Sequence, residues 1–261
     1  MTLKTALKHI VNLPLGWFDL RLERQATAND KGTPSFSHFM PTCFDRLRHA
    51  RSLGFNPRAI VDGGAFVGEF TREAAALFPG ARFVVVEPNP FVLESLRQNT
   101  RHITPPPILC QCALGASTGK TMFNIWGDPT KATGASLLAH VRGDADHTVD
   151  VTIETVDNLC AQYEFSAHFI KLDLQGAEAM ALEGAAKALA STEMLVVEFG
   201  CLEAYSGRAT PREIMDIAYD FGFCLYDIVD CHYRPYDGAL TGGDFLFVKR
   251  GSALKKYKGW D

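Results

Sequence analysis

The sequence lacks a long apolar run and an excess of positive charge. None of its 261 residues falls in an uninterrupted apolar stretch of 18 or more, which is about the length that a membrane-spanning helix needs. The 26 Lys and Arg residues are outnumbered by 30 Asp and Glu residues, so the formal net charge is −4. A chain with this balance has no broad basic surface for nucleic acid or an anionic membrane. We therefore expect neither a nucleic-acid partner nor a transmembrane segment.

The seven cysteines include no Cys-x-x-Cys pair. Even the two nearest in sequence, Cys110 and Cys112, are separated by a single residue within an apolar run. This spacing indicates neither a structural zinc site nor a dithiol redox centre, and we predict no metal site. An odd number of widely spaced thiols is typical of a reduced, cytoplasmic protein.

The first 25 residues are basic and partly apolar, but they do not form a continuous apolar core. Lys4, Lys8 and His9 interrupt them, and no small-residue cleavage site follows. This pattern favours a packing helix that ends near Pro14 over a secretory signal peptide. A helix that lies on a membrane surface is the alternative.

From residue 59 onward, short apolar runs alternate with helical segments. Helix patterns cover residues 68–78, 89–99, 177–189 and 211–219. Continuous apolar strands between helices are typical of a parallel sheet that is covered on both faces. The predicted strands are residues 59–61, 82–86, 108–112, 169–172 and 194–197.

The end of the chain breaks this alternation. Residues 222–228 and 244–248 both resemble strands, and no helix pattern lies between them. Because parallel neighbours need a long crossover, usually a helix, these two strands are predicted to be antiparallel.

We interpret the chain as one catalytic domain with an additional segment before it. Residues 1–57 look helical and irregular and are expected to pack on the core, and residues 58–261 form the domain. An insertion at about 116–166 contains two alternating, half-exposed strand patterns at 121–126 and 148–153, with turn clusters between them. We expect the insertion to lie over one edge of the sheet as a mobile cover.

A glycine-rich turn follows the first predicted strand, in the sequence VDGGAFVGEFT at residues 61–71. Gly63 and Gly64 allow a sharp turn and let a ligand approach the backbone. Gly68 permits close packing of the following helix on the strand. The turn lies at the carboxyl end of a parallel strand, which is where open α/β sheets bind ligands.

An acidic residue after the second strand supports a nucleoside site. Glu87 lies about twenty residues beyond the glycine turn, where a carboxylate can accept hydrogen bonds from both ribose hydroxyls. The dinucleotide pattern Gly-x-Gly-x-x-Gly is absent, and Asp62 precedes the glycines. A pyrophosphate would meet that negative charge, whereas a sulfonium with an α-amino group would be attracted to it. The arrangement favours S-adenosylmethionine over NAD.

These motifs resemble the FkbM family of S-adenosylmethionine-dependent methyltransferases. The resemblance extends from about residue 57 to residue 250, and its most specific part is IKLDLQGAEAMALEGA, which begins at Ile170. It implies the class I, Rossmann-like methyltransferase fold, an α/β structure with a seven-stranded, mostly parallel sheet, an antiparallel last strand and helices on both faces. Members of the family generally methylate hydroxyls of sugars, glycans or polyketide-type natural products.

The resemblance also implies which residues bind the cofactor. The family often has Asn where this chain has Phe66, and a single glycine where this chain has Gly63 and Gly64. Phe66 cannot donate a side-chain hydrogen bond, so it is expected to pack on the cofactor or cover it. The expected cofactor-binding residues are Asp62, Gly63, Gly64, Phe66, Gly68, Glu87, Pro88, Asn89, Cys112, Ala113, Leu114 and Asp173.

Three acidic residues are candidates for catalysis: Asp173, Glu178 and Glu198. Asp173 ends the fourth strand beside the expected position of the methyl group, so it could remove the acceptor proton or attract the cofactor. Glu178 could position the acceptor or only cap its helix, and Glu198 ends the fifth strand. Lys171 shares a strand face with Asp173 and could pair with it.

Acceptor contacts are harder to derive from the sequence. Tyr205 and Arg208 follow the fifth strand and could touch an acceptor. His140, His147 and His232 could each act as a base over the cleft, or could be ordinary surface residues.

The sequence thus predicts a cytoplasmic O-methyltransferase that acts on a small-molecule or glycan acceptor. An N-methyltransferase is disfavoured because Asp173-Leu174-Gln175-Gly176 replaces the usual Asn/Asp-Pro-Pro-Tyr type of motif. A scaffold or regulator that binds the cofactor without catalysis is also compatible with the motifs, and the glycine spacing disfavours an NAD-dependent enzyme. A homo-oligomer is compatible with the sequence, which does not identify the acceptor.

Overall fold

The computed structural model describes residues 41–141 and 143–256. The expectation that residues 1–57 form a helical, irregular segment therefore falls largely outside the described residues. The described part of that segment begins at residue 41 and contains helix α2 (Cys43–Ser52). Thr42 caps this helix: its hydroxyl accepts a hydrogen bond from the backbone N–H of Asp45, whose carboxylate accepts one from the N–H of Thr42.

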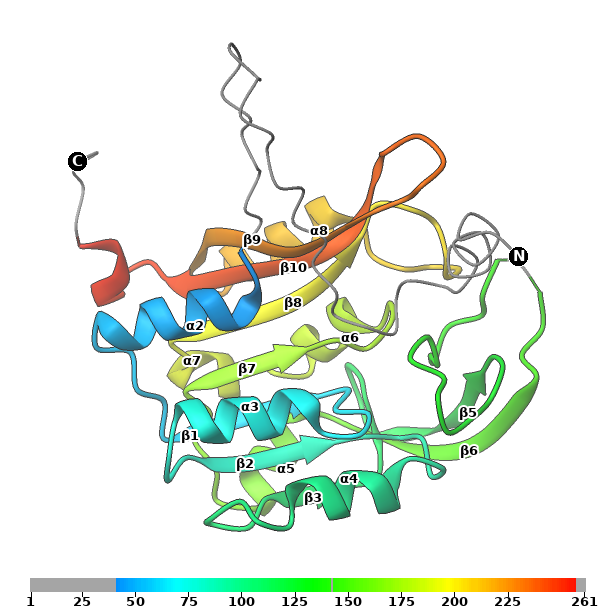
Figure 1. Cartoon of the computed structure of the whole chain (residues 1–261), viewed down its shortest axis with the longest axis horizontal. Helices are drawn as coiled ribbons and strands as arrows, with labels where there is room; N and C mark the ends of the chain where they lie inside the picture. The colour runs from blue at the N-terminus through cyan, green and yellow to red at the C-terminus, as the bar shows by residue number, and fades with distance from the viewer. Residues whose placement is uncertain (1–40, 142, 257–261) are drawn as a thin grey trace, which may run out of the picture. The chain divides into compact units, whose positions relative to one another are not determined.

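A seven-stranded sheet forms the centre of the domain, as Figure 1 shows. The strands lie in the order β3-β2-β1-β7-β8-β10-β9. All neighbours are parallel except β10, which is antiparallel to both β8 and β9. The predicted fold, with its antiparallel last strand, is therefore confirmed. The strand bounds are β1 Ala59–Gly63, β2 Arg82–Val86, β3 Ile108–Cys110, β7 Phe169–Leu172, β8 Met194–Gly200, β9 Phe223–Tyr233 and β10 Leu240–Lys249.

Helices cover both faces of this sheet and enclose two hydrophobic cores. Leu47 of α2, Ala74 of α3 (Glu69–Leu77) and Leu96 of α4 (Leu93–Thr100) belong to one core. The other core contains residues of four helices: α5 (Val156–Gln162), α6 (Glu178–Glu183), α7 (Ala188–Ser191) and α8 (Pro211–Asp220). The four central strands are fully or almost fully buried, which is why they appear in the sequence as continuous apolar runs.

A second, three-stranded sheet is built mainly from the insertion. Its order is β4-β6-β5, with β4 (Ala113–Leu114), β5 (Gly119–Ile125) and β6 (His147–Glu154). The two half-exposed strands expected in the insertion are confirmed as β5 and β6. The segment 116–166 also contains α5, which the sequence did not predict and which packs in the main core through Leu159.

Two predicted helices differ from the observed ones. The helix predicted over residues 177–189 is divided into α6 and α7, with Gly184 after α6; a Cβ on Gly184 would lie 2.2 Å from the carbonyl oxygen of Gly115. The helix expected to start at Asn89-Pro90 begins only at Leu93, because the Asn89 side chain accepts a hydrogen bond from the N–H of Phe91 and forms a turn.

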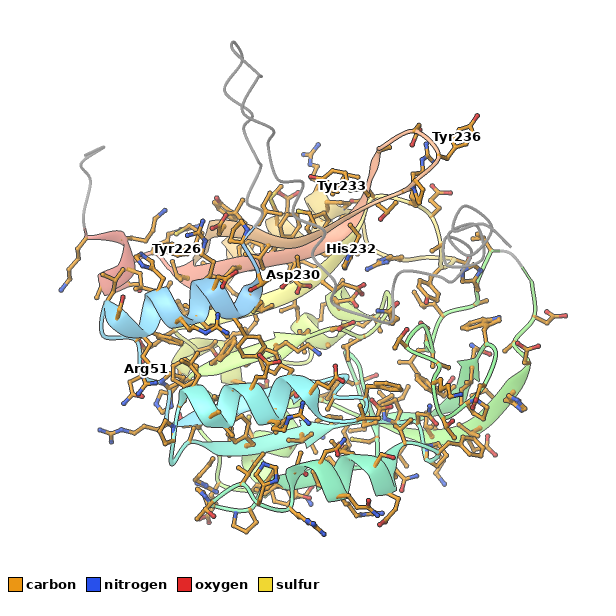
Figure 2. The ribbon with its side chains drawn as sticks, in the orientation of Figure 1. Arg51, Tyr226, Asp230, His232, Tyr233 and Tyr236 are labelled. Carbon is orange, nitrogen blue, oxygen red and sulfur yellow. The ribbon has the colours of Figure 1, made fainter. Side chains whose placement is uncertain are left out.

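Helix α2 is attached to the edge strand β9. The carboxylate of Asp230 accepts a hydrogen bond of 2.7 Å from the backbone N–H of Cys43, and Arg46 forms an ion pair with Asp227. Figure 2 shows Asp230 at the end of α2, and Tyr236 at the tip of the connection between β9 and β10. The short 3₁₀ helix Ala253–Lys255 follows β10. In the described ranges no helix is long and apolar enough to cross a membrane.

Candidate active site

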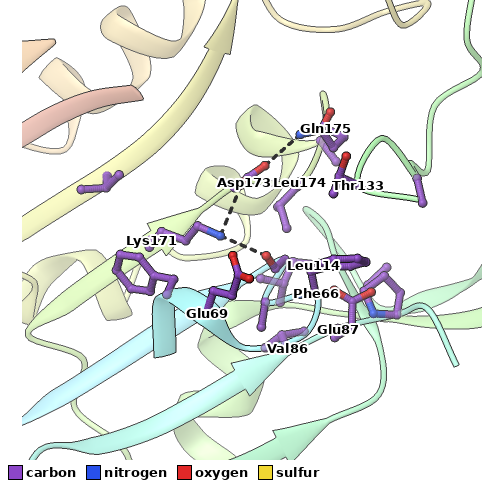
Figure 3. Close-up of a pocket in the computed structure, with 18 of the residues that line it drawn as sticks. Phe66, Glu69, Val86, Glu87, Leu114, Thr133, Lys171, Asp173, Leu174 and Gln175 are labelled. Atoms are coloured by element: carbon purple, nitrogen blue, oxygen red, sulfur yellow. Dashed lines mark hydrogen bonds and ion pairs between the residues drawn. The ribbon is translucent and has the colours of Figure 1, made fainter. Parts of the chain in front are cut away.

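A cavity of about 330 Å³ lies at the carboxyl ends of β1, β2 and β7. Its volume falls within the usual range for small-molecule sites, about 300–1,000 Å³. Figure 3 shows Phe66 and Glu87 on one side of the cavity, and Lys171 and Asp173 on another. Of the residues predicted from sequence, those that line it are Gly64, Phe66, Glu87, Pro88, Cys112, Ala113, Leu114 and Asp173.

The glycine turn lies directly against the end of β7. Gly64 has a φ of +73°, and a Cβ at this position would lie 1.8 Å from the carbonyl oxygen of Asp173. Its N–H donates a 3.0 Å hydrogen bond to the carbonyl of Val86. Only glycine fits both the backbone conformation and the available space.

Gly68 and Gly63 support the turn from behind the cavity. Gly68 has a φ of +85°, and an added Cβ would meet the Leu96 side chain of α4 at 2.7 Å. The close packing expected of Gly68 is therefore between the turn and a helix. An added Cβ on Gly63 would lie 2.9 Å from Leu114. Neither glycine lines the cavity.

Phe66 adopts a backbone conformation that is unusual for its residue type. Its φ is +49°, in the left-handed region that Asn tolerates better than Phe. Its N–H donates a 2.7 Å hydrogen bond to Glu87, and its side chain lines the cavity. The Asn that the resemblance leads us to expect at this position would suit this backbone conformation better than Phe66 does.

Glu87 is buried at the rim of β2, with 5% of its surface exposed. Its two carboxylate oxygens accept hydrogen bonds from the backbone N–H groups of Phe66 and Asn89. Burial raises the pKa of Glu87 to about 7, although these two hydrogen bonds oppose the increase. Each carboxylate oxygen can accept further bonds, so the geometry suits a ligand with neighbouring hydroxyls.

Asn89 contacts the insertion and does not line the cavity. Its side-chain amide donates a 2.8 Å hydrogen bond to the carbonyl of Pro129. The turn after β2 is therefore fixed to the loop that follows β5. This loop contributes Ala132, Thr133 and Ala135 to the cavity wall.

Asp62 lies beneath the cavity and is completely buried. It accepts a hydrogen bond from the hydroxyl of Thr71 and lies 3.4 Å from the ammonium of Lys171. Both contacts join β1 to neighbouring elements, α3 and β7. Because Asp62 does not line the cavity, its charge could reach a ligand only through Lys171 or across the intervening backbone.

Lys171 is the central cation of the site. Its ammonium lies 3.5 Å from Asp173 and donates a 3.0 Å hydrogen bond to the carbonyl of Gly64. The predicted pairing with Asp173 is confirmed. Burial by itself would lower the pKa of Lys171, but the carboxylates of Asp173 and Asp62 outweigh burial and raise it. The lysine therefore stays charged.

Asp173 remains accessible to the cavity, with 40% of its side chain exposed. The amide nitrogen of Gln175 donates to Asp173 at 2.9 Å and to Glu198 at 3.1 Å. Glu198 also pairs with Arg208 at 3.0 Å. Burial, reinforced by the charge of Asp173, raises the pKa of Glu198 well above its usual range. Glu198 does not line the cavity.

Glu178 has the partners of a structural residue. Only 1% of its surface is exposed, and its carboxylate accepts hydrogen bonds from the backbone N–H groups of Leu174 and Gly176. Burial raises its pKa, while Arg208 and these hydrogen bonds oppose the increase. It holds the turn between β7 and α6 and does not line the cavity.

Sequence reasoning missed several acidic and amide residues of the site. Glu69, Asp230 and Asp244 line the cavity, and Gln175 joins the two strand-end acids. Burial, followed by the charge of Asp173, raises the pKa of Asp244 to about 7. A signal for Asp244 did exist: it lies in the first half of β10, which runs antiparallel to β8, so this half lies beside the carboxyl end of β8.

The three candidate histidines lie outside the lining of the cavity. His147 begins β6 and His232 lies in β9. His140 packs against Trp126 and Tyr205 in the insertion. Within residues 41–141 and 143–256, no group of three or more His, Cys, Asp and Glu side chains is arranged to hold a metal ion.

Comparison with known proteins identifies the family. Residues 62–225 match the model of the methyltransferase FkbM domain, which is more than half of the chain. The 2-O-methyltransferase NoeI of Sinorhizobium fredii is 24% identical over 174 residues, which cover 62% of this chain and 71% of that protein.

Two solved structures are also among the matches. Methyltransferase FkbM of Methylobacillus flagellatus is 20% identical with a TM-score of 0.46; the match covers 73% of this chain and 43% of that one. Magnesium protoporphyrin IX methyltransferase of Synechocystis, solved with bound S-adenosylmethionine, is 13% identical with a TM-score of 0.44, over 84% and 86% of the two chains.

The residues that line the cavity fit S-adenosylmethionine. The glycine turn brings the backbone of Gly64 to the cavity, and Glu87 places a carboxylate at the end of β2, where ribose hydroxyls can donate to it. The apolar wall at Cys112, Ala113 and Leu114 suits a flat base. The chain belongs to the FkbM family of methyltransferases, and its cofactor is S-adenosylmethionine.

Proposed function

We propose that this protein transfers a methyl group to a hydroxyl of a sugar, a glycan or another polyhydroxylated natural product. The observation that carries the proposal is the Asp173 carboxylate, which is held from two sides by Lys171 and Gln175 and still faces the cavity. A fixed, accessible carboxylate at a strand end is suited to accept a proton from a hydroxyl. The relative NoeI is a 2-O-methyltransferase, which supports the same type of reaction.

The cofactor half of the cavity acts by orientation. S-adenosylmethionine supplies an electrophilic methyl group on a positively charged sulfur. Glu87 would accept hydrogen bonds from the ribose hydroxyls, and Phe66 would pack beside the adenosine together with the wall from Cys112 to Leu114. Gly64 lets the ligand approach the backbone closely. Asp62, Gly63, Gly68 and Asn89 hold this frame from outside the cavity.

The acceptor half of the cavity manages the proton. An oxygen of the Asp173 carboxylate takes the proton that the acceptor hydroxyl loses as its oxygen bonds to the methyl carbon and the carbon–sulfur bond breaks. Lys171 and Gln175 fix the orientation of this carboxylate. Glu198 acts through Gln175 as a positioning residue, and Glu178 has a structural role.

We also infer a cytoplasmic location, because all seven cysteines are free thiols.

The experiment is a transfer assay with S-adenosylmethionine that carries a ¹³C-labelled methyl group. Purified protein is incubated with sugars, polyols and amines, and the products are identified by NMR from the chemical shift of the transferred methyl group. Methyl ethers are expected. Transfer to nitrogen would show an N-methyltransferase, and tight cofactor binding with no transfer to any acceptor would show a scaffold.

The variant Asp173→Asn tests the proposed base. It keeps the shape of the side chain and removes its basicity, and Lys171 retains its pairing with Asp62. We expect kcat to fall at least about 100-fold, while the affinity for S-adenosylmethionine changes less than about tenfold.

Asp150→Asn is the matched control, because Asp150 is an exposed acid of β6 that does not line the cavity. Full activity of Asp173→Asn would make Asp173 structural, and lost cofactor affinity with normal single-turnover chemistry would make it a cofactor ligand. Loss of wild-type activity with a chelator would indicate a bound metal.

A further inference from the structure

A second cavity, of about 340 Å³, shares no lining residue with the cofactor cavity. It is formed between the insertion and the loop that follows β8. These two segments are far apart in the sequence and are joined by backbone hydrogen bonds, including one of 3.0 Å from Val141 to Ala204. Its lining residues are Trp126, Gly134, His140, Gly143, Asp144 and Tyr205.

Three rings form one wall of this cavity. The ring centres of Trp126 and His140 are 5.5 Å apart, those of Trp126 and Tyr205 are 6.1 Å apart, and those of His140 and Tyr205 are 5.3 Å apart. The indole N–H of Trp126 donates a 3.0 Å hydrogen bond to the carbonyl of Asp144, which fixes the plane of the ring. The wall is thus organised before any ligand binds.

The second cavity is coupled to the catalytic network through Tyr205. The Tyr205 hydroxyl lies 2.7 Å from the carbonyl of Gly134 and 3.2 Å from the side-chain oxygen of Gln175, whose amide nitrogen binds Asp173. Gly134 follows Thr133, which lines the cofactor cavity beside Gln175 in Figure 3. The second cavity is therefore linked to the proposed base by two hydrogen bonds, from Tyr205 to Gln175 and from Gln175 to Asp173.

We propose that the second cavity binds a sugar ring of the acceptor that is not itself methylated, stacked on Trp126. This inference rests on the proposed function. The C–H groups on one face of a pyranose carry partial positive charge and match the negative face of an aromatic ring. The carboxylate of Asp144 supplies an acceptor for hydroxyls. With one ring there, a hydroxyl of the neighbouring unit reaches Asp173, so the cavity selects glycans and glycosides over isolated small alcohols.

The test uses protein saturated with S-adenosylhomocysteine and three probes: methyl α-D-glucopyranoside, methyl β-D-galactopyranoside and methyl α-L-rhamnopyranoside. NMR follows the indole N–H signal of Trp126, assigned with Trp126→Phe. At least one probe is expected to shift this signal. Trp126→Ala should lower the affinity for that probe at least about tenfold, and Trp126→Phe should lower it less. The affinity for S-adenosylhomocysteine should change less than about threefold in both variants.

The control variant is Tyr236→Ala, since Tyr236 is 92% exposed at the tip of the connection between β9 and β10 (Figure 2) and lines neither cavity. It should bind the probes like the wild type. With an acceptor found in the transfer assay, Trp126→Ala should raise KM with little change in kcat, which is the pattern of a lost binding contact.

The outcomes separate this inference from the proposed function. A shifted Trp126 signal in a protein that methylates no hydroxyl would leave the sugar site standing and refute the proposed function. Hydroxyl methylation with an unchanged KM in Trp126→Ala, and no Trp126 shift with any of the three probes, would refute the sugar site and leave the function standing.

Discussion

Glu87 is buried and also faces the ligand cavity. Its pKa of about 7 lies far above the ordinary value of a glutamic acid, which is about 4.3. At pH values between these two pKa values, Glu87 keeps its proton in the folded protein but has released it in the unfolded chain. The free energy of unfolding should therefore decrease as the pH rises through this window, and Asp244, also with a pKa of about 7, adds to the same trend.

Cofactor binding should show the opposite dependence on pH. Ribose hydroxyls donate to the ionised Glu87, so the affinity for S-adenosylhomocysteine is expected to rise between about pH 6 and pH 8. Well below the pKa of Glu87, the affinity should fall about tenfold for each pH unit. Titration calorimetry in buffers of different ionisation enthalpy should detect proton release on binding near pH 7. In Glu87→Gln the affinity should be lower and nearly independent of pH.

Asp244→Asn is the control for this experiment, because Asp244 titrates in the same range and lines the same cavity. The pH dependence of the affinity should persist in Asp244→Asn. If Glu87→Gln kept the dependence and Asp244→Asn removed it, the proton would belong to Asp244 and the ribose assignment of Glu87 would lose its support.

At the scale of elements, the junction between the glycine turn and the end of β7 decides the geometry of the site. Gly64 and the carbonyl of Asp173 are in direct contact, so the cofactor loop and the proposed base are positioned by the same packing. Lys171 reinforces this junction, because it donates to the Gly64 carbonyl while it pairs with Asp173. A disturbance of one element is therefore expected to displace the other.

A pair of glycine variants tests this junction. Gly64 and Gly80 have similar φ values, +73° and +82°, but nothing lies within 4 Å of a Cβ added to Gly80. Gly80→Ala should lower the free energy of unfolding by about 1–2 kcal/mol, the cost of the left-handed conformation. Gly64→Ala adds overpacking, which typically costs roughly a further 1–3 kcal/mol.

Urea denaturation measures both variants, and calorimetry measures S-adenosylhomocysteine binding. Only Gly64→Ala should lose cofactor affinity. Equal destabilisation of the two variants, with unchanged affinity in both, would show that the turn and β7 are not mechanically coupled.

At the scale of the whole domain, the insertion contributes residues to the walls of both the cofactor cavity and the second cavity. It contributes Ala132, Thr133, Ala135 and Leu137 to the cofactor cavity, and Pro129 accepts a hydrogen bond from Asn89. The sequence led us to expect that the insertion is a mobile cover over one edge of the sheet. Its place in the cavity wall leads us to expect that changes in residues 127–147 weaken cofactor binding.

Hydrogen exchange followed by mass spectrometry tests this cover. S-adenosylhomocysteine should slow amide exchange in residues 128–138 as well as in the glycine turn, because the loop packs over the filled cavity. Residues 234–239, in the connection between β9 and β10, line neither cavity and serve as the internal reference. Protection of the glycine turn without protection of residues 128–138 would show that the insertion does not close over the cofactor.

The sequence by itself determined the elements whose signal is local. The continuous apolar runs of β1, β2 and β7 identified buried parallel strands, the missing helix before β10 identified the antiparallel end, and the spacing of Gly64 and Glu87 indicated a nucleoside site. These features depend on periodicity, on turn chemistry and on positions at strand ends, all of which are encoded within a few residues.

Only the tertiary structure decided which charges share the cavity and what each one does. Glu178 looked like Asp173 in the sequence, yet its oxygens are taken by backbone N–H groups. Asp244 and Tyr205 are separated from Asp173 by 71 and 32 residues, and the sheet and the loop after β8 bring them to the same site. Burial and charge pairing are properties of the surroundings in space, so the pKa values and roles of such groups are fixed only when the chain is folded.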